Sequence, residues 1–112
     1  ADFSTLWKLD GWIDRYLKGR KGGPKKLKLF LAEFTAPTDH PNHEFNFWVD
    51  RSVQAKWISA ALKVVRRNSR IYTMGWLSLY DEAPRKDHLE SDKGLLTFSG
   101  KKKAGYTAFK RG

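Results

Sequence analysis

The segment from Leu27 to Phe34 constrains the fold of this chain more than any other. It is an apolar run of strand length that carries one carboxylate, Glu33, near its C-terminal end. A second apolar run extends from Ile71 to Tyr80, and a helical pattern lies between the two. Strands that alternate with helices favour parallel pairing. The two predicted strands are therefore expected to lie side by side, joined by a crossover helix.

Three helices are predicted around these strands. The first begins after Ser4, a favourable N-cap, and ends at the glycines before Pro24. The second begins at Asp50 or Ser52, and the third is a short helix from Gly105 to Lys110. Apolar residues recur at helical spacing in the first two. Residues 1–112 are thus expected to form a single α/β unit.

The apolar stripes and the strand edges of this unit both need partners. We expect Trp7 and Trp12 of the first helix and Trp57 of the second to be core residues. Two parallel strands cannot close a sheet, and proteins normally pair or cover exposed strand edges. The sequence therefore predicts that further strands come from a second copy or from another polypeptide.

The charge balance favours anionic partners. Lysine and arginine total 22 against 12 acidic residues, a net charge of +10, which suits nucleic acid, an anionic membrane or an acidic polysaccharide. A well-solvated basic surface is the simpler alternative. No cysteine is present, which excludes disulfides and thiolate metal sites. There is no apolar run of membrane-spanning length and no signal-peptide pattern. The positive charges gather in Lys18–Lys21, Lys25–Lys26, Arg66–Arg67 and Lys101–Lys103.

Several short motifs follow one another in a definite order. They are Leu31–Phe34, Gln54–Trp57, Gly75–Asp81, Gly94–Leu96 and Lys103–Phe109. In this order and spacing the chain resembles the C-terminal part of a retaining TIM-barrel glycoside hydrolase, of the large cellulase- and xylosidase-like clan. The resemblance covers about three-quarters of the chain but only about two of the eight βα units of such a barrel.

The resemblance implies a role for Glu33 and a fold for the chain. Leu31–Phe34 resembles the seventh barrel strand, whose glutamate is the nucleophile of the family, and Gly75–Asp81 resembles the eighth strand. The chain departs from the family where Ala104 replaces a proline and Gly105 replaces an alanine. The expected fold is an α/β partial (β/α) barrel, with two parallel strands and flanking helices, that needs further strands to close.

The proposed chemistry needs a second carboxylate. Retaining glycosidases use two carboxylates about 5 Å apart, one as nucleophile and one as acid/base. In this family the acid/base residue lies on the fourth strand, which the chain does not contain, and neither Asp81 nor Glu82 matches an acid/base motif. Glu33 is therefore either the nucleophile of a barrel completed by other strands or a strand-end carboxylate that faces water.

Two tryptophans are candidate sugar-binding residues. Trp76 is either a stacking platform beside Glu33 or a core residue, because an indole ring suits both environments. Trp48 either lines a sugar cleft or packs as a hydrophobic staple before the second helix. His40 and His43 lack a third ligand nearby, so no metal site and no cofactor are expected.

The sequence predicts a fragment or subunit of a glycoside hydrolase-like barrel that carries the nucleophile strand. The expected partners are carbohydrate and either a second copy or a missing N-terminal barrel part. The alternative is a small basic module that binds nucleic acid or acidic glycan through its lysine and arginine clusters.

Overall fold

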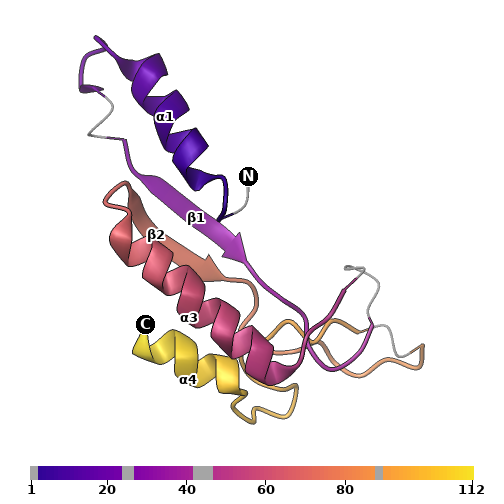
Figure 1. Ribbon diagram of the computed structural model, residues 1–112. Coiled ribbons are helices and arrows are strands. Elements are labelled where there is room, and N and C mark those ends of the chain that lie inside the picture. Colours follow the sequence, from indigo (N-terminus) through magenta and orange to yellow (C-terminus); the bar gives the residue numbers. More distant parts are fainter. Residues whose placement is uncertain (1–2, 24–26, 42–46, 88–89) are drawn as a thin grey trace.

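The computed structural model describes residues 3–23, 27–41, 47–87 and 90–112. Three helices and two strands form its regular structure (Figure 1). In chain order these are α1 (Leu6–Leu17), β1 (Leu29–Phe34), α3 (Arg51–Arg67), β2 (Ile71–Trp76) and α4 (Ala104–Arg111). The predicted order of helices and strands is confirmed.

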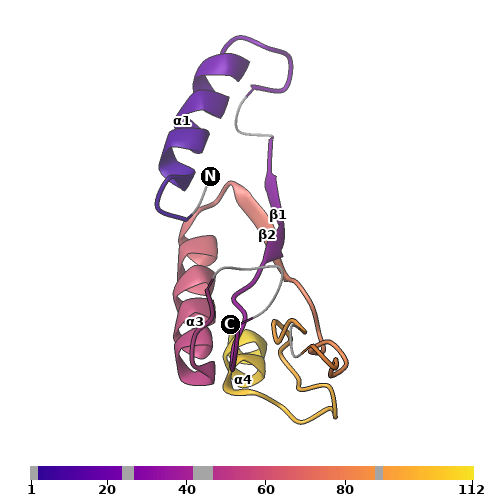
Figure 2. The ribbon, with the colours of Figure 1, turned by 90° about the vertical axis from the view of Figure 1, so that its right-hand side faces the viewer.

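The two strands form a parallel sheet that is open at both edges. Leu31 pairs with Met74, and Phe34 pairs with Trp76 at the carboxyl ends of the strands. In Figure 2, α3 and α4 lie on one side of the strands, and no described helix covers the other side. The fold is thus α/β and unclosed, as expected for a piece of a (β/α) barrel.

The strand β2 is shorter than predicted. The sequence predicts a strand to Tyr80, whereas β2 ends at Trp76. The Leu77 amide makes the last bond to β1, donating to the Phe34 carbonyl over 3.1 Å. Beyond it β1 has ended, so the chain has no ladder to continue and leaves the sheet. Tyr80 then forms an isolated parallel bridge with Leu96.

The core lies between α3, β2 and α4. Ile58 of α3 is fully buried and Met74 of β2 nearly so. Gln54, also fully buried, donates from Nε2 to the Ala36 carbonyl over 2.8 Å and so fixes α3 to the segment after β1. At Gly105 a Cβ atom would lie 2.6 Å from Oε1 of Gln54 and 3.0 Å from Cδ1 of Ile58, so α4 approaches the side chains of α3 closely at this glycine.

The expectation that Trp7, Trp12 and Trp57 are core residues is wrong. Trp7 and Trp12 are 69% and 61% exposed, and Trp57 is also exposed. No described helix or strand packs closely along α1, and Leu6 at its start is its one buried residue. The helix is held largely by polar contacts, in which Arg70 pairs with Asp10 and Asp14. The apolar stripe of α1 thus has no partner to bury its tryptophans.

The uncovered sheet also exposes large apolar side chains. Phe30 of β1 is 66% exposed and Tyr72 of β2 is 75% exposed. Apolar surface of this kind normally marks an interaction site. No described helix is long and apolar enough to cross a membrane. The exposed rings and the two open edges are the features that further barrel strands would cover.

Candidate active site

Glu33 lies near the carboxyl end of β1 with its side chain exposed. Among the described residues, none of the hydrogen bonds or ion pairs involves its carboxylate. The next residue, Phe34, pairs with Trp76 at the end of β2. Carboxyl ends of neighbouring parallel strands are where barrel enzymes gather their catalytic groups. The structure thus places Glu33 at the correct end of the sheet for such a role.

Trp76 is oriented by two contacts at the same end of the sheet. Its indole N–H donates to the Lys93 carbonyl over 2.9 Å. Its ring meets the ring of Phe34 edge-on, with centroids 5.4 Å apart, and the ring of Phe3 also meets that of Phe34 edge-on, with centroids 5.0 Å apart. The side chain is half-buried. One part of the ring packs while the other remains accessible, so both sequence-based alternatives for Trp76 stay open.

Trp48 lies on the segment that leads into α3 and is exposed. Its neighbour Val49 bridges in parallel with Thr38, and the Val49 amide donates to the Pro37 carbonyl over 3.0 Å. Trp48 therefore also lies near the chain that leaves β1. The ring contact that reaches α3 comes from Phe47, whose centroid is 6.3 Å from that of Trp57.

A buried ionic cluster beneath these residues was missed by the sequence analysis. The Lys103 side chain is fully buried, and its ammonium donates to Asp81 Oδ1 at 2.6 Å. It also donates to Thr38 Oγ1 at 2.8 Å and to the Asp92 carbonyl at 2.9 Å. These three bonds use all three ammonium donors. The segments after β1, after β2 and before α4 are thus held together at one point.

The partner of Lys103 is nearly as deeply buried. Burial raises the pKa of the Asp81 carboxyl, while the Lys103 ammonium and the Gly94 amide oppose that rise. The Gly94 amide donates to Asp81 Oδ1 over 2.8 Å. A Cβ atom on Gly94 would lie 2.3 Å from the Tyr80 carbonyl carbon, so only glycine allows this approach. Since Lys103 belongs to the predicted basic cluster Lys101–Lys103, one of that cluster's charges is unavailable to an anionic partner.

A more exposed ring of charges surrounds the Lys103 cluster. Burial acts to raise the pKa of Asp39, but hydrogen bonds from Thr38 and Arg51 outweigh it and leave that pKa below its usual value. His40 Nε2 lies 3.0 Å from Asp92 Oδ2. A hydrogen bond to the Pro41 carbonyl and the nearby carboxylates raise the pKa of His40. Burial, and then the charge of Asp81, raises the pKa of Asp92.

The described acids at this end therefore divide into two kinds. Asp39, Asp81 and Asp92 are tied to cations or buried, whereas Glu33, like Asp50 at the start of α3, is exposed without a cationic partner in the described part of the chain. A free carboxylate suits a nucleophile, and the others suit a scaffold. Within the same described ranges no three acidic or histidine side chains are grouped to hold a metal, and His43 lies outside those ranges.

Comparison with known proteins identifies solved structures that share the fold of this chain. No family model and no curated protein matches the sequence. Two of the solved structures that share this fold are β-glucuronidases. The enzyme from Faecalibacterium prausnitzii aligns with 99% of this chain at 15% identity and a TM-score of 0.60. The β-D-glucuronidase of Dictyoglomus thermophilum aligns with 98% at 16% identity and a TM-score of 0.61.

The match covers only a small part of each of these enzymes. The chain spans 19% of the length of each of these two enzymes. At 15–16% identity the likeness shows the fold alone. The three helices and the open two-stranded sheet thus have the arrangement of one part of a much longer chain.

Proposed function

We propose that this chain supplies the C-terminal βα units of a retaining glycoside hydrolase barrel and that Glu33 is its nucleophile. The observation that carries the proposal is the exposed, unpaired Glu33 carboxylate at the carboxyl end of a parallel strand, one residue before Phe34, which pairs with Trp76. The order of motifs along the chain and the fold shared with two β-glucuronidases support it.

The chain needs further strands before it can act. A retaining enzyme requires a second carboxylate about 5 Å from the nucleophile. Asp81 is unsuited to that role because it is buried against Lys103. The acid/base residue must therefore come from strands that pair with the open edges of β1 and β2. Those strands would also cover Phe30 and Tyr72.

The substrate we propose is a β-glycoside with an anionic sugar, a glucuronide being the first candidate. The names of the two similar enzymes suggest it, and a net charge of +10 favours an anionic substrate. We assign Trp76 and Trp48 to the sugar-binding surface, since both lie at the carboxyl end of the sheet and retain accessible ring area. Aromatic faces contact the C–H groups of sugars.

Covalent labelling tests the nucleophile directly. The protein at its natural full length is incubated with a 2-deoxy-2-fluoro-glucuronide, which traps the glycosyl-enzyme ester, and its peptides are analysed by mass spectrometry. We expect the sugar on the peptide that contains Glu33. Glu33→Gln is expected to abolish labelling and reduce kcat by at least about 10³-fold, with an unchanged melting temperature.

Glu82→Gln is the matched control. It makes the same chemical change at a partly exposed carboxylate near the end of β2, where the amide oxygen still accepts from the Ser91 amide. Labelling and turnover should persist in this variant. Labelling of another carboxylate, or turnover that survives Glu33→Gln, would refute the assignment of Glu33.

A further inference from the structure

The two C-terminal helices carry an unusual charge distribution. Neither α3 nor α4 contains an aspartate or a glutamate. The cations of α3 are Arg51, Lys56, Lys63, Arg66 and Arg67. Arg51 is paired with Asp39, and within the described ranges no carboxylate pairs with the other four. This face of the molecule therefore carries positive charge that no described aspartate or glutamate side chain neutralises.

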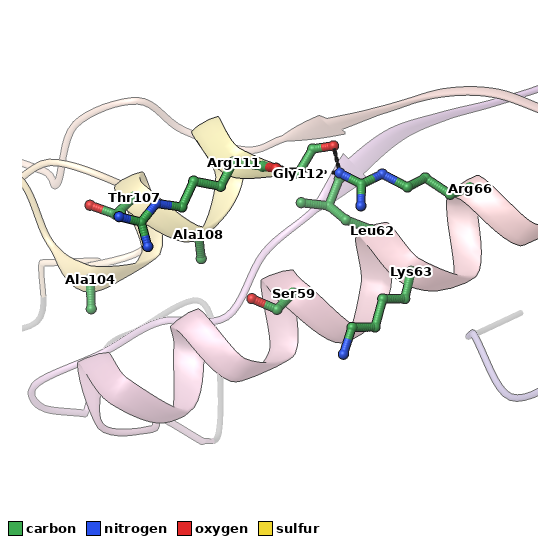
Figure 3. Close-up of a pocket in the computed structure, with 9 residues that line it drawn as sticks. All are labelled: Ser59, Leu62, Lys63, Arg66, Ala104, Thr107, Ala108, Arg111 and Gly112. Atoms are coloured by element: carbon green, nitrogen blue, oxygen red, sulfur yellow. Dashed lines mark hydrogen bonds between the residues drawn. The ribbon is translucent and has the colours of Figure 1, made fainter.

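The same face is hollowed into a groove. One pocket of about 380 Å³ lies between α3 and α4, and Ser59, Lys63, Arg66 and Arg111 are among its lining residues. Figure 3 shows the α3 residues facing the α4 residues across this pocket. A second pocket of about 370 Å³ continues from it along α3, because Ser59 and Lys63 line both; Lys56 borders only the second. We call the two together the α3–α4 groove.

The floor and the rim of the groove have different chemistry. Small side chains, such as Ser59 and Ala108, form its floor and let a ligand approach the helices. Cations form its rim. Lys56 and Lys63 are two helical turns apart on α3, or roughly 10 Å at 1.5 Å per residue, and Arg66 follows one turn later. Arg66 also donates to the Arg111 and Gly112 carbonyls, which links the two sides of the groove (Figure 3).

We propose that the α3–α4 groove binds an acidic polysaccharide, meaning a sugar chain that bears closely spaced sulfate or carboxylate groups. A row of cations without carboxylates matches a row of anions along a linear chain. Of the described residues that line the groove, none is aromatic, whereas proteins that bind single-stranded nucleic acid stack its bases on aromatic rings. The hydroxyls of Ser59 and Thr107 add donors suited to sugar and sulfate oxygens.

This site is distinct from the one around Glu33. The groove lies on α3 and α4, outside the sheet, whereas Glu33 lies at the carboxyl end of β1. It would hold an acidic glycan chain by its anionic groups without contacting the reacting bond. The groove can therefore bind glycan whether or not Glu33 proves to be a nucleophile.

The test is a titration of the full-length protein with a heparin hexasaccharide by calorimetry at 0.15 M NaCl. Cellohexaose and a single-stranded DNA 18-mer are the comparison ligands. We expect binding of the heparin fragment, no measurable binding of the neutral sugar and weaker binding of the DNA. Affinity should fall steeply with salt, because the contacts are ionic and exposed.

Two double variants that remove the same number of charges distinguish binding in the groove from a general electrostatic attraction to the basic protein. Lys63→Gln with Arg66→Gln removes two cations from the groove, and Arg15→Gln with Lys18→Gln removes two exposed cations from the region of α1. We expect the groove variant to lose at least about tenfold in affinity, since each charge-assisted contact is worth about that much. The α1 variant should lose less than about twofold, as expected for distant exposed charges.

A third variant tests whether a loss of binding comes from the groove itself and not from a structural effect of removing Arg66. Ser59→Glu places a negative charge on the groove floor and keeps every cation, so it should also abolish binding of the heparin fragment. Each variant is checked for an unchanged melting temperature. Equal losses in the two double variants, tight binding that persists in Ser59→Glu, or DNA binding as tight as that of the glycan would each overturn the proposal.

Discussion

Replacing Lys103 by methionine tests the central claim about how this end of the molecule is held together. Methionine keeps most of the volume of the side chain but removes the ammonium group. Asp81 Oδ1, Thr38 Oγ1 and the Asp92 carbonyl each lose a donor at 2.6–2.9 Å. The Lys103 side chain is fully buried, so no solvent is in place to replace those bonds. Asp81 Oδ1 would keep the Gly94 amide and the Asp92 carbonyl would keep the Thr38 amide as donors. The main consequence is therefore a buried Asp81 carboxylate without its cation.

The expected cost follows from the burial of both charges. Hydrogen bonds that involve a charged group contribute about 1.5–3 kcal/mol each, but values within one network do not add. Removing one partner of a buried ion pair costs about 3–5 kcal/mol. We expect Lys103→Met to lower the free energy of unfolding by that amount. Domains have total stabilities of about 5–15 kcal/mol, so the loss would be severe.

The loss of stability in Lys103→Met should depend on pH. Burial raises the pKa of Asp81, and Lys103 opposes the rise. Without Lys103 the pKa rises further, and the folded state then binds a proton more readily than the unfolded state. A carboxyl with a raised pKa favours folding below its unfolded pKa of about 3.9, and that contribution is lost as the pH rises through the folded pKa. Lys103→Met should therefore cost least near pH 4 and most near pH 7.

The assay is equilibrium urea unfolding of the full-length protein, followed by tryptophan fluorescence at several pH values. Lys101→Met makes the same substitution at an exposed lysine two residues earlier and should change stability by less than about 0.5 kcal/mol. A cost for Lys103→Met below about 1 kcal/mol, or one that is the same at pH 4 and pH 7, would refute the reasoning, because the pair would then not be buried and coupled as described.

Two further predictions concern the tryptophan and the assembly. Trp76→Ala is expected to weaken binding of a competitive glycoside inhibitor about tenfold with a stability loss below about 2 kcal/mol; a stability loss of about 3–5 kcal/mol with unchanged inhibitor affinity would identify Trp76 as a packing residue. The isolated 112-residue chain is expected to self-associate, because both sheet edges are open and Phe30 and Tyr72 are exposed. Light scattering checks this, and a monodisperse monomer with a cooperative thermal transition would contradict it.

The local sequence pattern was sufficient to predict the helices and strands, but not which of their side chains are buried. Asp50 was one of two predicted N-caps of the second helix, and α3 begins directly after it. Strand β1 lies within the predicted segment because a short apolar run between glycines and a proline-rich loop admits few alternatives. Trp12 was predicted to be buried from its helical spacing and is exposed. Spacing shows which face of a helix is apolar, but only a neighbouring element can bury that face.

The residues of the candidate site could likewise be predicted only in part from the sequence. Glu33 could be selected from sequence because it lies in a predicted strand and in a motif that resembles the nucleophile strand of a glycoside hydrolase family. Lys103 begins the motif Lys103–Phe109, but it stands in a run of three lysines that is typical of a solvated surface, so its burial could not be predicted. Its three acceptors come from positions 11 to 65 residues away in the chain. Nothing local in the sequence shows that this lysine is buried while its two neighbours are exposed.

The sequence by itself determined the α/β class, the order of helices and strands, the strand that carries Glu33, and the need for further strands. These follow from residue periodicity, turn residues and the number of strands, all of which are local. Only the tertiary structure decided where β2 ends, which charges are buried and which cations border the α3–α4 groove. Each of these depends on contacts between segments far apart in the chain, and the free energy of a charge depends on whether such contacts remove it from water.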